Sequence, residues 1–264
     1  MPPDLFFVLT LIVKMAVTAG FVVAATVTAE RAGPVVGGLV ATLPISAGPV
    51  YVFLAMDHDA HFIAQSAVAS LVINSANGIF ATVYALLAQK RSLLASLAGG
   101  YLAWFAYALP IRAIDWSFAG AAALNVGVLG ICMVLTRAIR YMRTPPFHAR
   151  WNDFLLRAVM VAVLVGVVVT FSFQLGAAGS GVFAVFPVVM TSIALVMHPR
   201  MGGKASAAVL ANTPLGLLGF ACACSVLHVA AEPLGTPAGL ALALLASLAW
   251  SLLMMLAHRP PATP

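Results

Sequence analysis

Charge is what this sequence has least of. Only 8% of its 264 residues are Asp, Glu, Lys or Arg, whereas a soluble domain carries roughly 25%. Hydrophobic residues make up 63% of the chain, in runs long enough to cross a hydrocarbon core of about 30 Å as helices. This composition leaves no room for a soluble domain and predicts an all-α polytopic membrane protein surrounded by the lipid bilayer. The net charge of +6 is no nucleic-acid signal, because the charges lie between apolar runs.

Cysteine and catalytic motifs are also scarce. Cys132, Cys222 and Cys224 all fall inside apolar runs, so we expect packing residues rather than disulfides. The chain has no HExxH, GxSxG or phosphate-loop motif, and we predict no enzymatic activity. The start MPPDLFFVLT lacks the basic residues of a secretory signal, so its apolar run is predicted to be a permanent span.

Hydropathy predicts nine membrane helices joined by short connections. We expect them over residues 5–29, 34–56, 62–88, 93–111, 117–136, 154–175, 180–197, 205–230 and 237–257.

The basic residues predict the orientation. With nine helices, most Lys and Arg fall in loops on one side, namely Lys90, Arg91, Arg137, Arg140, Arg143, Arg150, Arg200, Lys204 and Arg259. The positive-inside rule then places the C-terminus in the cytoplasm and the N-terminus outside. We expect a multi-pass protein of the cell membrane, with the bacterial inner membrane as its location.

The two halves of the chain resemble each other weakly. The stretch 37–58 aligns with 179–199 and places Pro44 opposite Pro187. The stretch 66–80 aligns with 205–220 and places Asn74 opposite Asn212. This predicts a first repeat over residues 1–111, a connecting helix and basic loop over 112–150, and a second repeat over 151–264. An offset of five helices makes the second copy inverted, an architecture common among secondary transporters.

Helix-breaking and polar residues occur at corresponding places in both predicted repeats. The predicted helix 62–88 contains NSANG and the predicted helix 205–230 contains NTPLG, so we expect both to be interrupted at mid-membrane. Kinked helices with structural hydrogen bonds are the alternative. The predicted solute or ion site consists of Asn74, Ser75, Asn77, Gly78, Asn212, Thr213, Pro214 and Gly216.

On these repeats and paired interruptions, the chain resembles the inverted-repeat carriers with crossed, broken helices, which include sodium/proton antiporters and bile-acid-type sodium symporters. The resemblance covers most of the chain as architecture and rests on no specific signature. It implies alternating access around the broken helices. Such carriers usually have ten or more helices and five per repeat, whereas four per repeat plus a connector are predicted here.

Few ionisable groups lie within the predicted spans. Lys14 and Arg157 occupy matching positions in the two repeats and favour an organic anion as solute, although either side chain could instead snorkel to the membrane surface. No Asp or Glu lies at the centre of a span, so coupling would use sodium bound to neutral oxygens or a proton on Lys14 or His228. Gln65 joins the predicted site, and secondary candidates are Ser46, Ser66, Gln174, Thr191 and Ser192.

Two other functions compete with a transporter. The outer loop carries Asp57, His58, Asp59 and His61, which are metal-binding residue types without a recognised spacing, so a membrane-embedded metalloenzyme is one alternative. Asp59 could instead cap the following helix. The other alternative is a subunit of a membrane complex that transports nothing. No cofactor is predicted, and a homo-oligomer remains open.

Overall fold

The computed structural model describes residues 3–31, 47–140, 142 and 150–257, and every element in these ranges is helical. The elements are α1 (Pro3–Arg31), α3 (Ala47–Asp57), α4 (Ala60–Ala88), α5 (Leu93–Ile111), α6 (Phe118–Leu135), α7 (Arg137–Arg140), α8 (Trp151–Ala184), α9 (Val188–Met201), α10 (Gly203–Ala211), α11 (Thr213–Leu234) and α12 (Thr236–Ala257).

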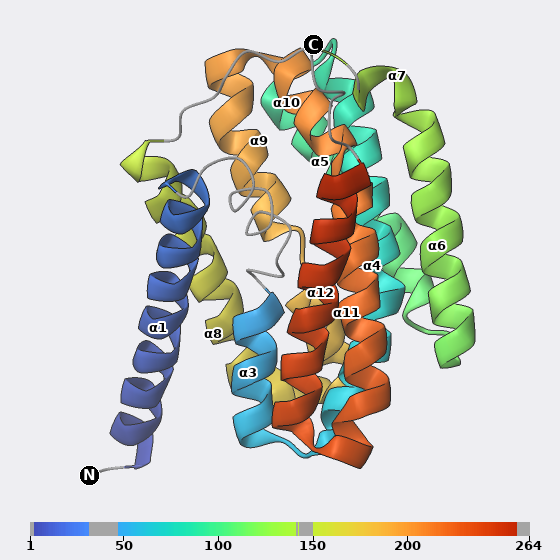
Figure 1. Ribbon diagram of the computed structural model, residues 1–264. Coiled ribbons are helices and arrows are strands. Elements are labelled where there is room, and N and C mark those ends of the chain that lie inside the picture. Colours follow the sequence, from blue (N-terminus) through green and yellow to red (C-terminus); the bar gives the residue numbers. More distant parts are fainter. Residues whose placement is uncertain (1–2, 32–46, 141, 143–149, 258–264) are drawn as a thin grey trace.

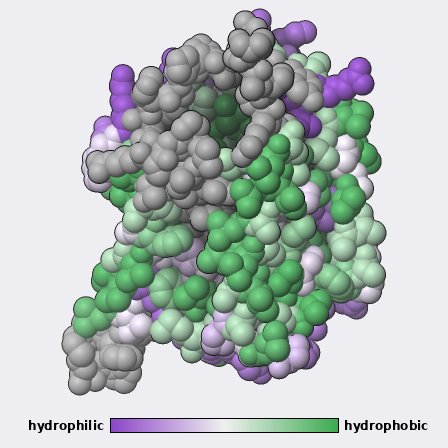
Figure 2. All heavy atoms as spheres, in the orientation of Figure 1, coloured by the Kyte–Doolittle hydropathy of each residue, from purple (hydrophilic) through white to green (hydrophobic). Residues whose placement is uncertain are grey.

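Seven helical stretches of the described residues are long and apolar enough to cross a membrane. One of them, Trp151–Met201, contains both α8 and α9, and α3 is shorter than a full span. Hydrophobic side chains cover the middle of the surface and hydrophilic ones gather toward its two ends (Figure 2). The described part of the chain is therefore an all-helical protein of multi-pass membrane type. The predicted break at Pro44 and the candidate Ser46 lie outside the described residues.

Helix α4 forms the centre of the bundle (Figure 1). Helices α5, α6, α8, α10 and α11 all pack against it, and most of its residues are buried. Its first turn is capped as the sequence suggested, since Asp59 accepts a hydrogen bond of 2.8 Å from the Phe62 amide. The predicted interruption at Asn74–Gly78 is wrong, because α4 continues unbroken from Ala60 to Ala88. Hydrogen bonds from the side-chain N–H groups of Asn74 and Asn77 to carbonyls of neighbouring segments hold both amides without unwinding the backbone.

The break occurs instead between α8 and α9. The chain first reverses at Gly176, whose φ of 64° and ψ of −177° interrupt the regular helix. Residues before this reversal contact residues after it in an antiparallel register. Asp153 accepts a hydrogen bond from Arg200, and Arg157 Nε donates to Ser192 Oγ. The returning segment ends at Ala184, and α9 begins at Val188 after Pro187. Proline at 187 carries no amide hydrogen, which favours a new helix start there.

The second predicted interruption is present, and it lies nearer one end of its helical stretch than the middle. Helix α10 ends at Ala211 and α11 begins at Thr213, with Pro214 in its first turn. Asn212 is only the tenth residue of the 32-residue stretch Gly203–Leu234. The interruption therefore lies nearer the end at which α7 and the α9–α10 junction gather (Figure 1).

Candidate functional site

Three asparagines are buried where α4 meets its neighbours. Asn74 and Asn77 come from α4, Asn125 comes from α6, and the exposed fraction of Asn74 is 0%. Lone amides in apolar surroundings must find hydrogen-bond partners, because an unsatisfied polar group costs about 1–3 kcal/mol. Their partners define a polar region inside an apolar bundle.

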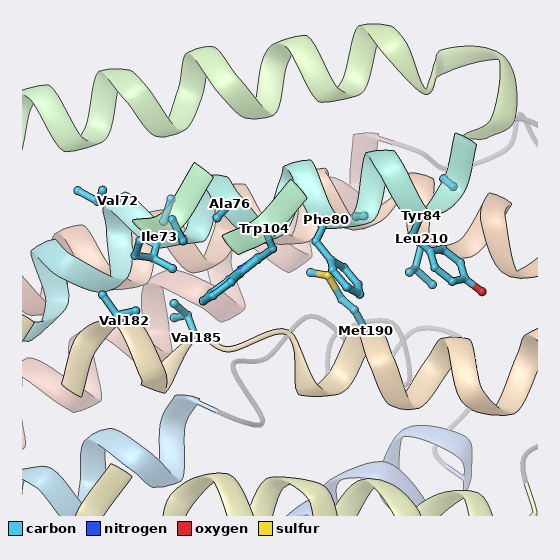
Figure 3. Close-up of a cluster of buried hydrophobic side chains, with 14 of the residues drawn as sticks. Val72, Ile73, Ala76, Phe80, Tyr84, Trp104, Val182, Val185, Met190 and Leu210 are labelled. Carbon is cyan, nitrogen blue, oxygen red and sulfur yellow. The ribbon is translucent and has the colours of Figure 1, made fainter. Parts of the chain in front are cut away.

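Asn77 ties the α8–α9 break to the rest of the bundle. Its Nδ2 donates to the Val185 carbonyl oxygen at 2.7 Å, and its Oδ1 accepts from Trp104 Nε1 at 2.8 Å. Trp104 and Val185 lie close together beside α4 (Figure 3). Val185 follows the last residue of α8, so its carbonyl has left the regular helix. Asn77 thus satisfies backbone that the break releases.

Asn74 has an acceptor without a partner. Its Nδ2 donates to the Leu217 carbonyl of α11 at 2.9 Å and lies 3.4 Å from Asn125 Oδ1. Asn125 Nδ2 donates in turn to the Leu71 carbonyl at 2.6 Å. The Asn74 Oδ1 atom is buried and has no protein hydrogen bond. This oxygen could accept a hydrogen bond from water or solute, or contribute to binding a cation.

Two serines extend the polar face of α4 along the returning part of α8. Ser66 Oγ donates to the Ala177 carbonyl at 3.0 Å, and Ser70 Oγ donates to the Gly181 carbonyl at 2.7 Å. With Asn77, three side chains of α4 therefore bond to carbonyls spaced four residues apart. This register makes α4 and the segment 177–185 parallel.

The remaining predicted residues of α4 have structural partners. Ser75 Oγ donates to the Val72 carbonyl at 2.5 Å and lies 3.1 Å from the Tyr107 hydroxyl. Gly78 does not loosen the helix. A Cβ placed there would collide with Leu129 of α6, so the glycine permits close packing.

Asn212 does not meet Asn74. Its Nδ2 donates to the Arg140 and Ala208 carbonyls at 3.2 and 2.9 Å, and its Oδ1 lies 3.3 Å from Arg140 Nε. Thr213 Oγ1 donates to the Leu210 carbonyl at 2.8 Å. Pro214 is buried, whereas Gly216 has open space around it. The structure therefore divides the predicted site into a buried group on α4 and a separate group at the α10–α11 junction, of which Asn212 is exposed.

Neither predicted cation lies in the buried network. Lys14 Nζ is 2.6 Å from Oδ2 of Asp57, the last residue of α3, and 5.7 Å from the centre of the Phe53 ring. Arg157 bonds Ser192 in the antiparallel α8–α9 pair. Lys14 is thus neutralised by a neighbouring carboxylate.

The last two predicted residues lie outside the network. Gln65 is exposed on α4, and His228 Nδ1 is 3.0 Å from the Ala64 carbonyl with its ring against Phe118. Among the secondary candidates, Thr191 bonds the Tyr101 hydroxyl at 2.6 Å, and Gln174 is exposed.

The four ionisable side chains at the α3–α4 junction, Asp57, His58, Asp59 and His61, have separate partners. Asp57 pairs with Lys14, and His58 Nε2 bonds Ser172 Oγ at 2.8 Å while its ring stacks on Phe62 at 3.7 Å. His61 bonds Glu232 at 2.9 Å. Burial lowers the pKa of His58, against the opposing effect of Asp57 and Asp59. Within the described ranges, no three His, Cys, Asp or Glu residues gather as a metal site.

Sequence reasoning missed Asn125, Trp104 and Tyr107. Asn125 is a lone amide in the apolar run of α6, which is a sequence signal for a buried hydrogen-bonding residue. Val185 and Leu217 take part only through their backbone carbonyls, which every residue type has, so the sequence gives no signal for them.

Compared with protein-family models, with curated proteins and with solved structures, the chain gave no match in any of the three cases.

Proposed function

We propose that this protein is a secondary carrier of a small solute that works by alternating access. The observation that carries this proposal is the α8–α9 break beside the buried amides of α4. Non-helical backbone at membrane depth is tolerated only where protein or a water-filled site satisfies it. Broken helices of this kind provide the binding sites of many carriers.

The solute would bind next to Asn74, whose Oδ1 is the unpartnered acceptor of the network. Neighbouring groups are the amide of Asn125 and the Leu217 carbonyl of α11, and Asn77, one turn further along α4, bonds the break at Val185. Amide and carbonyl oxygens also suit sodium as a coupling ion, because it is a hard cation. A proton carried by Lys14 or His228 is the other coupling mode in this proposal.

The inverted repeat and the nine crossings belong to the same proposal. Helix α9 begins directly after Pro187, and α3 begins three residues after its predicted counterpart Pro44. The reversal at Gly176 supports counting the stretch 151–201 as two crossings. Counting residues 34–56 as a further crossing gives nine, with an external N-terminus and a cytoplasmic C-terminus in the inner membrane of a bacterium.

An organic anion is the first solute class to test, because Lys14 and Arg157 suggested it. The pairing of Lys14 with Asp57 weakens that argument and makes neutral polar solutes equally suitable. Asp57, His58 and His61 engage separate partners, so their arrangement does not support the metalloenzyme alternative. If the protein were instead a non-transporting subunit of a membrane complex, the α8–α9 break would have only a structural role.

Uptake by proteoliposomes tests the proposal. Purified protein is reconstituted, and uptake of labelled carboxylates, amino acids and sugars is measured with and without sodium or proton gradients. We expect uptake of one class by the wild type and a loss of about tenfold or more in Asn74→Ala. Ser225→Ala is the control, since Ser225 bonds only to its own helix at Ala221. No uptake of any class, or equal uptake by Asn74→Ala, would overturn the proposal.

A further inference from the structure

An apolar cavity lies away from the buried amides, none of which lines it. Its volume is about 390 Å³, within the range of small-molecule sites. Four helices line it, with Val17 and Thr18 from α1, Tyr51 and Val52 from α3, and residues of α11 and α12 opposite them.

The cavity offers water almost nothing to bind. Thr18 Oγ1 already donates to the Lys14 carbonyl at 2.8 Å, and the Tyr51 hydroxyl is 2.7 Å from Ser70 Oγ. Cys224 contributes only a thiol, which hydrogen-bonds weakly. A cavity without polar partners stays dry or holds an apolar group. We therefore expect the group that fills the cavity to be apolar.

The mouth of the cavity faces the surroundings of the bundle. The exposed fractions are 57% for Val17, 48% for Val52 and 46% for Leu244, although all three side chains line the cavity. In a membrane these side chains meet acyl chains, so a lipid tail can enter sideways from the bilayer.

A charge pair stands at the outer end of the cavity. Lys14 lies one turn before Thr18 in α1, and its Nζ lies over Phe53, another lining residue. Asp57 lies one turn after Phe53, pairs with Lys14 at 2.6 Å and keeps 31% of its side chain exposed. The Lys14 side chain is only 9% exposed, so a phosphate would have to approach its ammonium through that small opening to use the further donors. Asp57 has a second oxygen for an ammonium group.

We infer that the cavity binds one acyl chain of a zwitterionic phospholipid whose head group is phosphoethanolamine. The phosphate would accept from Lys14 Nζ, and the primary ammonium would donate to Asp57. Paired opposite charges match a zwitterion better than an anionic lipid, because neither charge is left unpaired. The cavity is separate from the Asn74 network, and the lipid site shares with the proposed transport only Lys14, one of the two candidate proton carriers.

The test is lipid retention after detergent purification and exchange into mixed micelles holding equal phosphatidylethanolamine and phosphatidylcholine. The bound lipids are counted by native mass spectrometry. We expect the wild type to retain about one phosphatidylethanolamine per chain. Ala243→Leu and Ala241→Phe fill the cavity and should retain about tenfold less. Ala249→Leu is the matched control, since Ala249 is exposed on the same helix and lines no part of the cavity.

A separate variant tests whether the site recognises the lipid head group. Asp57→Leu should remove the preference for phosphatidylethanolamine over phosphatidylcholine while lipid is still retained, because leucine has no acceptor for the N–H groups that the trimethylammonium head lacks. Ala241 is exposed at the rim, so its variant remains informative if Ala243→Leu fails to fold. Equal retention by the two filled variants and Ala249→Leu would overturn the inference, as would a wild type without head-group preference. A dimer that Ala241→Phe dissociates would identify a second copy as the occupant and also overturn it.

Discussion

Asn77 of α4 donates a hydrogen bond of 2.7 Å to the carbonyl of Val185, at the point where the α8 helix ends. One side chain of an unbroken helix thereby supports the break of its neighbour. The same amide accepts from Trp104 of α5, so three helices meet at a single residue. The break is consequently built into the packing of the bundle and is held in a defined geometry.

Asn77→Leu should destabilise the fold by about 3 kcal/mol, because it leaves the Val185 carbonyl and the Trp104 indole N–H buried without partners. Ser75→Ala, two residues away on the same helix, should cost only about 1 kcal/mol. Thermal unfolding of both variants in detergent checks this. Equal midpoints for the two variants would show that the hydrogen bonds of Asn77 do not hold the break.

Gly181→Ala should destabilise the protein by about 2 kcal/mol or more, since a Cβ there would collide with the Ser66 carbonyl of α4. Gly216→Ala is the matched control, because a Cβ at that position meets nothing within 4 Å. Alanine has the higher helix propensity, so the control should be neutral or stabilised by up to about 1 kcal/mol. Unfolding midpoints measure both effects. A stabilised Gly181→Ala would mean that α4 and α8 lie farther apart.

Lys14→Met should cost about 2 kcal/mol, because Asp57 loses its partner while keeping only part of its contact with water. The double variant Lys14→Met, Asp57→Leu should recover most of that loss, since no unpaired charge is left. A double-mutant cycle of unfolding free energies measures the coupling. Additive losses would show that the two residues do not interact.

Stability should depend on pH through His58. Burial lowers its pKa in the folded protein below the ordinary value, so the unfolded chain binds the proton more readily. Its contribution is fully present above about pH 6.5, the unfolded pKa, and is lost as the pH falls toward the folded pKa. The unfolding midpoint of the wild type should therefore drop between pH 7.5 and about 5.5 more steeply than that of His58→Gln. Identical slopes would exclude His58 as the source.

The sequence was sufficient to predict the helical membrane class, because composition and run length alone determine it. It also indicated the Asp59 cap and the interruption at Asn212, since both depend on local residue preferences. Both signals depend only on residues that lie close together in the sequence.

The unbroken course of α4 was not predictable in the same way. Asn74, Asn77 and Gly78 are unfavourable in an isolated apolar helix, yet here Leu217, Val185 and Leu129 on other helices accommodate them. Tertiary hydrogen bonds and close packing override the local preference. The pairing of Lys14 with Asp57 likewise joins residues 43 positions apart and required the folded bundle.

The most direct test of the proposed carrier is thermal unfolding of the purified protein, scanned against carboxylates, amino acids and sugars with and without sodium. A solute that binds the native state raises the unfolding midpoint by mass action. The account predicts a rise with one solute class in the wild type and in Ser225→Ala, and no rise in Asn74→Ala. A wild type that responds to no solute, or a response that survives in Asn74→Ala, would contradict it.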